Sequence, residues 1–527
     1  MKLQFVSLLT FLNVINFSVA FVPWAPIPIT GARSQSRVPD SMTNAERLIR
    51  ELPPRAPKGL FNRLKPRTPT TSQTVCKRGS NGNGNGNDNG NGNSNGNGGA
   101  SADNQFSLQE RLTRPYVLQQ NWGAYSPYYP VAKYVAPPEG CKITQLQRHG
   151  ARYPTAGPGA AIAIAVNKLQ NALAYTDSSL NFIRNFTLDL GTNDLVLFGA
   201  AQSLAAGAET YKRYKELVSV GNLPFVRASS SDRVVKSALN WTYGFSAASS
   251  LRFNPVLSVI LDENANDTLH NSCGAIGSSD NQTDTWIAIY TPSIVQRLNN
   301  AAPGANLSSN DVFNLMTLCA FESVATESIS DWCRLFDEDE WKAFEYEMDL
   351  DKYYGTGYGQ PLGPVEGIGY INELIARLTS SPVNDTTQTN STLDRSPVTF
   401  PLDRTIYADF SHDNQLIAIY TAMGLFKQPR ALDPTNSNVD STNRTWITSQ
   451  LVPFSARMVI EKIQCGIGSS RQDEDEDYLR ILVNDAVQSL DFCAGVSKEG
   501  ICRVSEFVES QSYATNGGNG DWQKCFE

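Results

Sequence analysis

Histidine is scarce in this chain, which has only three histidines among 527 residues. A metal-dependent His-Asp site needs several more histidine or carboxylate ligands, so this scarcity argues against one. After the first 20 residues, no apolar run is long enough to cross a bilayer. A surplus of positive charge is also missing: the formal net charge is -8, which gives no indication of binding to nucleic acid or acidic membranes. The hydrophobic fraction of 41% is that of an ordinary globular protein.

The first 20 residues have the pattern of a secretory signal peptide. Lys2 gives a positive start, residues 5–15 are mainly apolar, and the small residues Ser18–Ala20 precede the expected cut. A membrane anchor is the alternative, and it is disfavoured because Asn13 and Asn16 interrupt the apolar stretch. We therefore expect a secreted, extracellular protein that does not bind a membrane.

Glycosylation signals agree with export. Eight Asn-x-Ser/Thr triplets without an intervening proline are spread through the globular region, which is typical of a secreted glycoprotein. They begin at Asn185, Asn240, Asn266, Asn281, Asn306, Asn384, Asn390 and Asn443.

Nine cysteines are spread along the chain at long, irregular intervals. A zinc site would have closely spaced pairs, so disulfide bonds are the better interpretation. Cys76 is followed at once by Lys77 and Arg78, a dibasic pair of the kind that secretory processing proteases cut. We expect cleavage there to remove Cys76 and to leave an even set. That set is Cys141, Cys273, Cys319, Cys333, Cys465, Cys493, Cys502 and Cys525.

Residues 21–120 do not have the pattern of a folded domain. Prolines are scattered between residues 23 and 69, and a nearly pure Gly/Asn tract runs from Asn81 to Gly99. Proline prevents long helices, and the tract has no apolar side chains to bury. We expect a disordered propeptide or linker here, followed by a catalytic body over residues 121–527.

In the region 121–527, strand-like and helix-like segments alternate, which predicts an α/β protein. A region of about 245–350 is more helical and is expected to be an inserted α domain, with Asp331 as a candidate N-cap. The expected strands are Lys142–Gln147, Phe225–Ala228, Thr405–Phe410, Ala456–Gln464 and Tyr478–Asn484. The expected helices are Ala160–Tyr175, Gln202–Val218, two within Leu315–Leu350, Gly367–Leu378 and Gln415–Met423.

Two of the three histidines lie in short polar segments that suit phosphate chemistry. His149 lies in Arg-His-Gly-Ala-Arg-Tyr-Pro, residues 148–154, directly after an expected strand, and His412 lies in Ser-His-Asp-Asn, residues 411–414. A neutral imidazole can attack phosphorus, and the two arginines of the first segment offer planar forks that match phosphate oxygens. His270 lies in a polar loop and shows no such signal.

A phosphomonoester hydrolase that works without a metal needs a nucleophile, cations around the phosphoryl oxygens and an acid for the leaving alcohol. We expect His149 to be the nucleophile, through a phosphohistidine, and His412 to donate a hydrogen bond to the phosphoryl group. Asp413 is the expected acid; its place near a helix start favours the anion, so this role needs the substrate's charge as well. The expected cations are Arg148, Arg152 and Arg233.

The segments 148–154 and 411–414 together resemble the active-site motifs of the histidine acid phosphatases, and more narrowly of the fungal phytases. The likeness extends from about Trp122 to Phe526. It includes Tyr-Tyr-Gly at 353–355, Pro-Leu-Gly-Pro at 361–364, Gly-Tyr-Ile-Asn-Glu-Leu-Ile-Ala-Arg-Leu at 369–378 and Tyr-Ala-Asp-Phe at 407–410. The segment 273–319 and the pair Asp351-Lys352 look closer to the basidiomycete branch.

The resemblance implies a three-layer α/β/α domain of the phosphoglycerate-mutase-like kind beside a smaller inserted α domain, with the active site between them. It implies the same catalytic set of Arg148, His149, Arg152, Arg233, His412 and Asp413. By the same matching, Tyr125, Lys352 and Asn414 contact substrate, without a cofactor or metal. The implied disulfides are Cys141–Cys465, Cys273–Cys525, Cys319–Cys333 and Cys493–Cys502.

Departures from the resemblance concern the grip on substrate. The better-known ascomycete phytases carry a lysine where this chain has Pro158, and two lysines where it has Asp351 and Lys352. Fewer lysines imply weaker local attraction for a hexakisphosphate. The favoured function is a secreted, monomeric acid phytase, a 6-phytase or 3-phytase acting on inositol hexakisphosphate. The alternatives are a broad-specificity acid phosphatase with the same mechanism and an inactive wall protein tethered by the Gly/Asn tract, against which the complete catalytic set argues.

Overall fold

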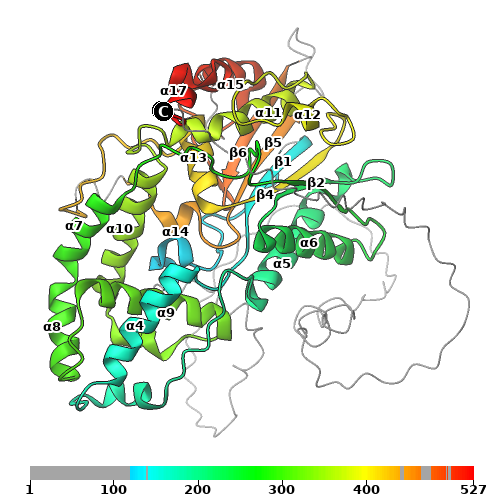
Figure 1. Cartoon of the computed structure of the whole chain (residues 1–527). Coiled ribbons are helices and arrows are strands. Elements are labelled where there is room, and N and C mark those ends of the chain that lie inside the picture. Colours follow the sequence, from blue (N-terminus) through cyan, green and yellow to red (C-terminus); the bar gives the residue numbers. More distant parts are fainter. Residues whose placement is uncertain (1–118, 138–139, 439–443, 465–475, 494, 496–499) are drawn as a thin grey trace, which may run out of the picture. The chain divides into compact units, whose positions relative to one another are not determined.

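The computed structural model describes residues 119–137, 140–438, 444–464, 476–493, 495 and 500–527 (Figure 1). The expected signal peptide, the propeptide or linker and Cys76 lie outside these residues.

One mixed sheet organises this part of the chain, with the strand order β3-β2-β4-β1-β5-β6-β7 and β8 paired with β6. The strands from β3 to β1 in this order are parallel, whereas β5 runs antiparallel to β1. The carboxyl ends of four neighbouring strands therefore share one edge. The strands are β1 (Gly140–Arg148), β2 (Phe225–Ser229), β3 (Leu257–Leu261), β4 (Ile406–Ser411), β5 (Arg457–Gln464), β6 (Asp477–Val483), β7 (Ala486–Val487) and β8 (Cys502–Arg503).

The helices alternate with these strands along the chain, and none among the described residues is both long and apolar enough for a membrane span. The longer ones are α4 (Ala156–Gln170), α5 (Leu197–Tyr214), α6 (Asp232–Ala248), α7 (Asp280–Tyr290), α8 (Pro292–Ala301), α9 (Ser309–Thr326), α10 (Glu338–Gly355), α11 (Ile368–Thr379) and α13 (Asp413–Met423). The short ones are α12 (Ser391–Asp394), α14 (Thr448–Leu451), α15 (Val504–Ser510), α16 (Ser512–Thr515) and α17 (Asp521–Lys524). Short 3-10 helices are η1 (Gln119–Asn121), η2 (Gly123–Tyr125), η3 (Ser178–Asn185), η4 (Lys215–Leu217), η5 (Asp331–Leu335), η6 (Pro364–Gly367) and η7 (Gly517–Gly520).

Helices cover both faces of the sheet, because successive side chains of a strand point to opposite faces. On one face, Leu146 of β1 and Tyr407 of β4 share a core with α11 and α13. On the other face, Ala408 and Phe410 of β4 pack with Trp241 of α6, and α5 packs along α6 (Figure 1). The result is the expected three-layer α/β/α arrangement.

A second core lies among α4, α8, α9 and α10. Leu169 of α4, Phe321 of α9 and Trp341 of α10 are buried in it. Its helices come from two stretches of the chain, since α4 precedes β2 and α8 to α10 follow β3. Within the expected insertion at 245–350, β3 pairs with β2 as part of the sheet. The helical core is thus partly built from a segment outside that range.

The expected N-cap at Asp331 is wrong. Ser330 caps the short helix η5, accepting a hydrogen bond from the backbone of Trp332. The long helix α10 begins after Asp337, which forms a reciprocal capping box with Glu340. Asp331 and its neighbour Ser330 both have the short oxygen-bearing side chain that N-caps prefer. Residue type alone therefore does not tell which of the two is the cap.

The structure confirms three of the four implied disulfides, Cys273–Cys525, Cys319–Cys333 and Cys493–Cys502. The fourth, Cys141–Cys465, lies outside the side chains that the structure describes.

Candidate active site

The sheet itself brings His149 and His412 together. β1 and β4 are parallel neighbours, and Arg148 at the end of β1 is paired in register with Ser411 at the end of β4. Each histidine is the next residue along its chain, and the His149 amide donates to the Ser411 carbonyl at 3.0 Å. The two imidazole centroids are 5.7 Å apart. The site therefore lies at the carboxyl edge of the parallel strands, where open α/β sheets bind ligands.

His149 has the protonation state of a nucleophile. Its ring is buried, and Nδ1 lies 2.8 Å from the Gly150 carbonyl, so Nδ1 carries the hydrogen and Nε2 keeps a lone pair. Burial, with the charges of Arg148 and Arg152, holds the pKa of His149 well below its usual range. The imidazole thus stays neutral to a lower pH than an ordinary histidine does.

The backbone beside His149 allows no side chain at Gly150. A Cβ there would lie 2.1 Å from the Gly199 carbonyl oxygen, and a Cβ at Gly199 would lie 2.0 Å from the Ala151 oxygen. The start of α5 is therefore in direct backbone contact with the segment that carries His149.

Arg148 is a buried framework residue of the site. Its Nη1 donates to the carbonyls of Ala124 and Val452, and its Nη2 lies 3.0 Å from Oδ2 of Asp413. The guanidinium also lies 4.7 Å from the Phe454 ring centroid. Burial lowers the pKa of Arg148 to about 10, which still leaves it charged at acidic pH.

Arg152 and Arg233 supply unsatisfied donors. The Nε groups of both, and of Arg148, are buried without an acceptor among the described residues. Positive charge on Arg152 and Arg233 acts on His149, and Arg152 also acts on Asp413. Buried N–H groups that lack a partner are costly, and phosphate oxygens would satisfy them.

His412 is held between two charged side chains. Its Nδ1 lies 3.2 Å from Nη2 of Arg233, and its Nε2 lies 2.9 Å from Oε1 of Glu263. Arginine can only donate, so Nδ1 accepts and Nε2–H donates to the carboxylate. Burial lowers the pKa of His412, and the Glu263 carboxylate opposes this change.

Asp413, the first residue of α13, is ionised in the free site. Burial alone would raise its pKa, but Arg148 and Lys352 outweigh burial and hold the pKa of Asp413 well below its usual range. Oδ2 lies 3.0 Å from Arg148 and 3.4 Å from Lys352. In this free site the Asp413 carboxyl therefore holds no proton that it could donate.

The expected substrate contacts border the same site. Lys352 Nζ donates to Oδ1 of Asn414 at 2.7 Å and lies 3.1 Å from Oδ2 of Asp351. The Tyr125 ring packs on Phe321 at 4.6 Å between centroids, and burial raises the pKa of its hydroxyl. Tyr125 and Asp351 also line a cavity of about 340 Å³.

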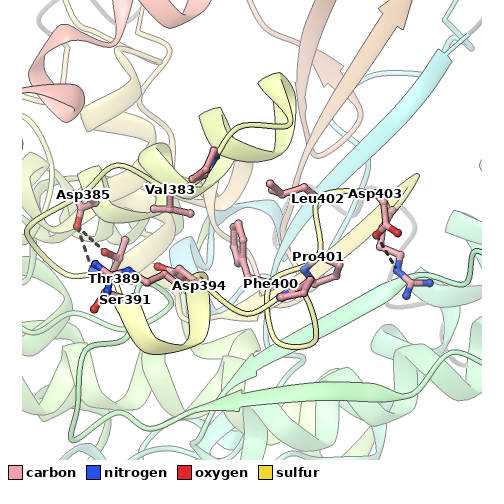
Figure 2. Close-up of a pocket in the computed structure, with 13 residues that line it drawn as sticks. Val383, Asp385, Thr389, Ser391, Asp394, Phe400, Pro401, Leu402 and Asp403 are labelled. Atoms are coloured by element: carbon pink, nitrogen blue, oxygen red, sulfur yellow. Dashed lines mark hydrogen bonds and ion pairs between the residues drawn. The ribbon is translucent and has the colours of Figure 1, made fainter.

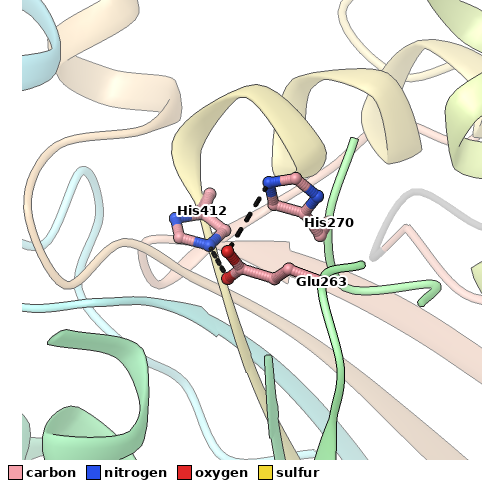
Figure 3. Close-up of side chains that lie close together, drawn as sticks. All are labelled: Glu263, His270 and His412. Carbon is pink, nitrogen blue, oxygen red and sulfur yellow. Dashed lines mark hydrogen bonds and ion pairs between the residues drawn. The ribbon is translucent and has the colours of Figure 1, made fainter. Parts of the chain in front are cut away.

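Two residues of the site carried no sequence signal. Glu263 and His270 both follow β3, a strand that pairs with β2 and that the sequence pattern does not predict. The two side chains lie beside His412 (Figure 3). The centroids of His270 and His412 are 5.4 Å apart. His270, which shows no signal for phosphate chemistry in the sequence, thus lies beside one of the two polar segments. Recognising β3 as a parallel strand would have placed its following loop at the site edge.

A cavity of about 650 Å³, larger than the one beside Tyr125, lies elsewhere (Figure 2). Its lining lies within 382–404 and ends two residues before β4 begins at Ile406, whereas His412 follows the other end of β4 and His149 follows the neighbouring end of β1. Burial raises the pKa of Asp394 in this cavity to about 7. Size alone does not mark the catalytic centre here.

Comparison with known proteins gives the same picture. Residues 142–484 match the family model described as histidine phosphatase superfamily (branch 2). The chain is 42% identical to Phytase A of Emericella nidulans over 431 residues, covering 77% of this chain and 90% of that one. It is 40% identical to Phytase A of Aspergillus oryzae, with the same coverage of both chains.

Among solved structures, the phytase from D. castellii matches with a TM-score of 0.61 at 21% identity, covering 79% of this chain and 88% of that one. A multiple inositol polyphosphate phosphatase from Bifidobacterium longum, in complex with inositol hexasulfate, matches at 0.56 and 11% identity, with coverages of 75% and 97%. These two likenesses bear on the fold. The family model and the sequence relatives show that the chain belongs to branch 2 of the histidine phosphatase superfamily, in the family of the fungal phytases.

Proposed function

We propose that the chain is a secreted acid phytase, which hydrolyses phosphomonoesters of myo-inositol hexakisphosphate through a phosphohistidine on His149. The observation that carries the proposal is the state of this imidazole: it is neutral, and the Gly150 carbonyl engages Nδ1 so that Nε2 keeps its lone pair. Three guanidinium groups act on the ring with positive charge, as phosphate binding requires. Phytase A relatives at 42% and 40% identity support the substrate class.

In the first half-reaction, Nε2 of His149 attacks phosphorus, and the bond from phosphorus to the inositol oxygen breaks. The Asp413 carboxyl gives its proton to that oxygen, so a neutral alcohol leaves. The carboxyl gains this proton when the anionic substrate binds, because a nearby phosphate raises its pKa. Arg233 stops donating a hydrogen bond to Nδ1 of His412 and donates to a phosphoryl oxygen instead. Once protonated, His412 donates from Nδ1 to the same group while Nε2–H stays on Glu263.

In the second half-reaction, water attacks the phosphorus of the phosphohistidine, and the phosphorus–nitrogen bond breaks. The Asp413 carboxylate now accepts a proton from that water, which reverses its earlier role. Inorganic phosphate leaves, and the electron pair of the broken bond returns to Nε2 of His149.

The grip on the other phosphates of the substrate is modest. Lys352 is already engaged by Asp351, Asp413 and Asn414, and Pro158 is exposed and uncharged. Specificity for phytate therefore rests more on Tyr125 and the arginines than on a lysine-rich rim. A comparison of kcat/KM on phytate and p-nitrophenyl phosphate at acidic pH tests this. A large preference for the aryl ester would replace phytase by a broad-specificity acid phosphatase.

The phosphohistidine has a direct test. Phytate carrying radioactive phosphorus is mixed rapidly with the enzyme, quenched without acid, and the labelled peptide is mapped. Label on His149, absent from a His149→Ala variant, is the expected result. Phosphate release with label on another side chain, or with no label, would overturn the mechanism.

Secretion is supported by the acceptor asparagines. Of the eight expected glycosylation sites, seven lie within the described residues and none of these is buried; Asn443 lies outside. Three disulfides are consistent with an oxidising compartment. N-terminal sequencing of protein recovered from culture medium checks the proposal. A chain that begins near Phe21 would retain Cys76 and contradict the expected dibasic cleavage.

A further inference from the structure

Glu263, His270 and His412 form a compact cluster on the edge of the active site (Figure 3). One ligand atom from each, an imidazole nitrogen or a carboxylate oxygen, lies within 4.8 Å of the other two. Oε1 of Glu263 is 2.9 Å from Nε2 of His412, and Oε2 is 3.8 Å from Nε2 of His270. Both imidazoles point toward the carboxylate.

We propose that this cluster binds a divalent cation of the zinc class. The cation would be held by Nε2 of His270, Nε2 of His412 and the Glu263 carboxylate. It takes no part in the proposed reaction, and its binding does not rest on the proposed function.

The ligand set and its spacing fit such an ion. Two imidazoles and one carboxylate are a three-ligand set that zinc commonly takes, with a fourth position for water or an anion. Bonds of about 2 Å in a tetrahedron place ligand atoms roughly 3.3 Å apart. The two Glu263 distances, 2.9 and 3.8 Å, lie on either side of that spacing. Small side-chain rotations would bring the three ligand atoms within bonding distance of one cation.

His270 has no other visible task. Its Nε2 is too far from Glu263 for a hydrogen bond, at 3.8 Å. Its Nδ1 is buried and has no hydrogen-bond partner among the described residues. An imidazole with neither nitrogen committed can place its proton on Nδ1 and offer the Nε2 lone pair toward Glu263, which is the arrangement that a cation needs.

Acidic side chains lie around His270. The carboxylates of Asp267 and Glu366 are close enough that the charge of His270 acts on both. Arg233 opposes a cation, because its Nη2 is 3.2 Å from Nδ1 of His412. A metal on Nε2 of His412 displaces the proton there to Nδ1, which then no longer accepts from Arg233. That guanidinium must turn away, so metal binding and the resting contact exclude each other.

The test uses the full-length protein and zinc chloride alone, at about pH 7, where an unperturbed imidazole is mostly neutral. Isothermal titration is expected to show one tight zinc site per chain. His270→Gln keeps a polar side chain of similar size and should weaken this site at least tenfold, as a rough lower bound for a lost ligand. Asn271→Ala, a change in the same loop that removes no ligand atom, should leave it intact. Magnesium, which prefers oxygen ligands, should not compete.

Far-UV circular dichroism of His270→Gln and Asn271→Ala should match that of the wild type, so that a weakened site does not come from misfolding. Equal zinc affinity in His270→Gln and wild type would overturn the site. Activity is measured separately, with p-nitrophenyl phosphate and without added metal. A wild type with no phosphatase activity at all would refute the proposed function, and the titration would still decide the site.

Discussion

At the scale of single residues, the free site holds two opposite ionisation states side by side. Burial and the arginines keep His149 neutral, while Arg148 and Lys352 keep Asp413 ionised. In the proposed mechanism, the nucleophile His149 is therefore ready before substrate arrives, whereas Asp413 becomes an acid only when substrate binds. Since protonated Asp413 is needed for the alcohol to leave, the rate should fall as pH rises above the pKa of this carboxyl in the complex.

Asp413→Asn tests the acid directly. Loss of the proton donor should lower kcat/KM on phytate by about 10² to 10⁴. kcat/KM covers only the steps up to departure of the leaving group, so the later role of Asp413 in hydrolysis does not enter it. The loss of kcat/KM on p-nitrophenyl phosphate should be much smaller, because nitrophenolate leaves without a proton. Steady-state kinetics on both substrates across acidic pH measures this. An equal loss of kcat/KM on the two esters would show that Asp413 acts on substrate binding instead of on the leaving alcohol.

At the scale of elements, α5 and the segment after β1 depend on each other. Gly199, within the first turn of α5, and Gly150 approach backbone to backbone, so neither position has room for a Cβ. Sheet register places the two histidines, and this helix contact fixes the segment that follows His149.

Replacing Gly199 by alanine should destabilise the protein, although the same change within a helix usually stabilises it. Alanine stabilises helices by up to about 1 kcal/mol relative to glycine. Here the new Cβ would meet the Ala151 oxygen at 2.0 Å, so both melting temperature and kcat should fall. Gly157→Ala, in the first turn of α4 with nothing within 4 Å, is the matched control and should lose neither. An active, unperturbed Gly199→Ala enzyme would show that α5 does not position the loop.

β4 also contains a buried ionic network. Asp409, three residues before His412, accepts from Arg227 at 2.8 Å and from Arg377 at 2.5 Å. Burial would raise the pKa of Asp409, but the two arginines outweigh burial and lower it far below its usual range. Because the folded pKa is depressed, this stabilisation is present above the unfolded value of about 4 and is lost as pH falls toward the folded one.

Asp409→Asn should therefore cost about 3 to 5 kcal/mol of unfolding free energy at neutral pH, because it leaves buried guanidinium charge without its partner. The difference from wild type should shrink as the solution is made strongly acidic. Urea titration at several pH values measures both effects. Asp403→Asn, whose side chain is 84% exposed, is the control and should unfold like wild type. A pH-independent deficit would point to packing rather than charge.

At the scale of the whole molecule, disulfides join distant parts of the chain. Cys273–Cys525 closes a separation of 252 residues and fastens the C-terminal end beside the loop after His270, whereas Cys319–Cys333 closes only 14 within the helical core. All four cysteines are buried, so the two pairs differ mainly in loop length.

Replacing each pair by alanine should separate these contributions. The chain-entropy model gives about 5 kcal/mol for the long loop and about 3 kcal/mol for the short one. The Cys273→Ala/Cys525→Ala enzyme should therefore unfold at lower urea than the Cys319→Ala/Cys333→Ala enzyme. The reverse order would mean that packing of the helical core, rather than chain entropy, dominates.

The predictable parts of this fold are those with a strong local pattern. β1, β4, β5 and β6 lie within two residues of their expected limits. β3 was missed because it is short and half exposed, with Pro255 just before it. The helical core mixes α4 with later helices, and no local pattern reports such a long-range contact.

The same limit applies to the site. Arg148, His149, His412 and Asp413 were identified because two short segments concentrate the right chemistry. Glu263 contributes through a hydrogen bond to a residue 149 positions away, which sequence spacing cannot reveal. The ionisation of Asp413 likewise depends on Lys352 from α10, a helix of the other core.

The register of β1 on β4 has a practical consequence. Both imidazoles are attached to paired strand ends rather than to a hinge or a lid. Their separation cannot widen while the central pairing persists, so heat should abolish turnover only when the sheet melts. Residual activity after a heat pulse would then count surviving native molecules directly.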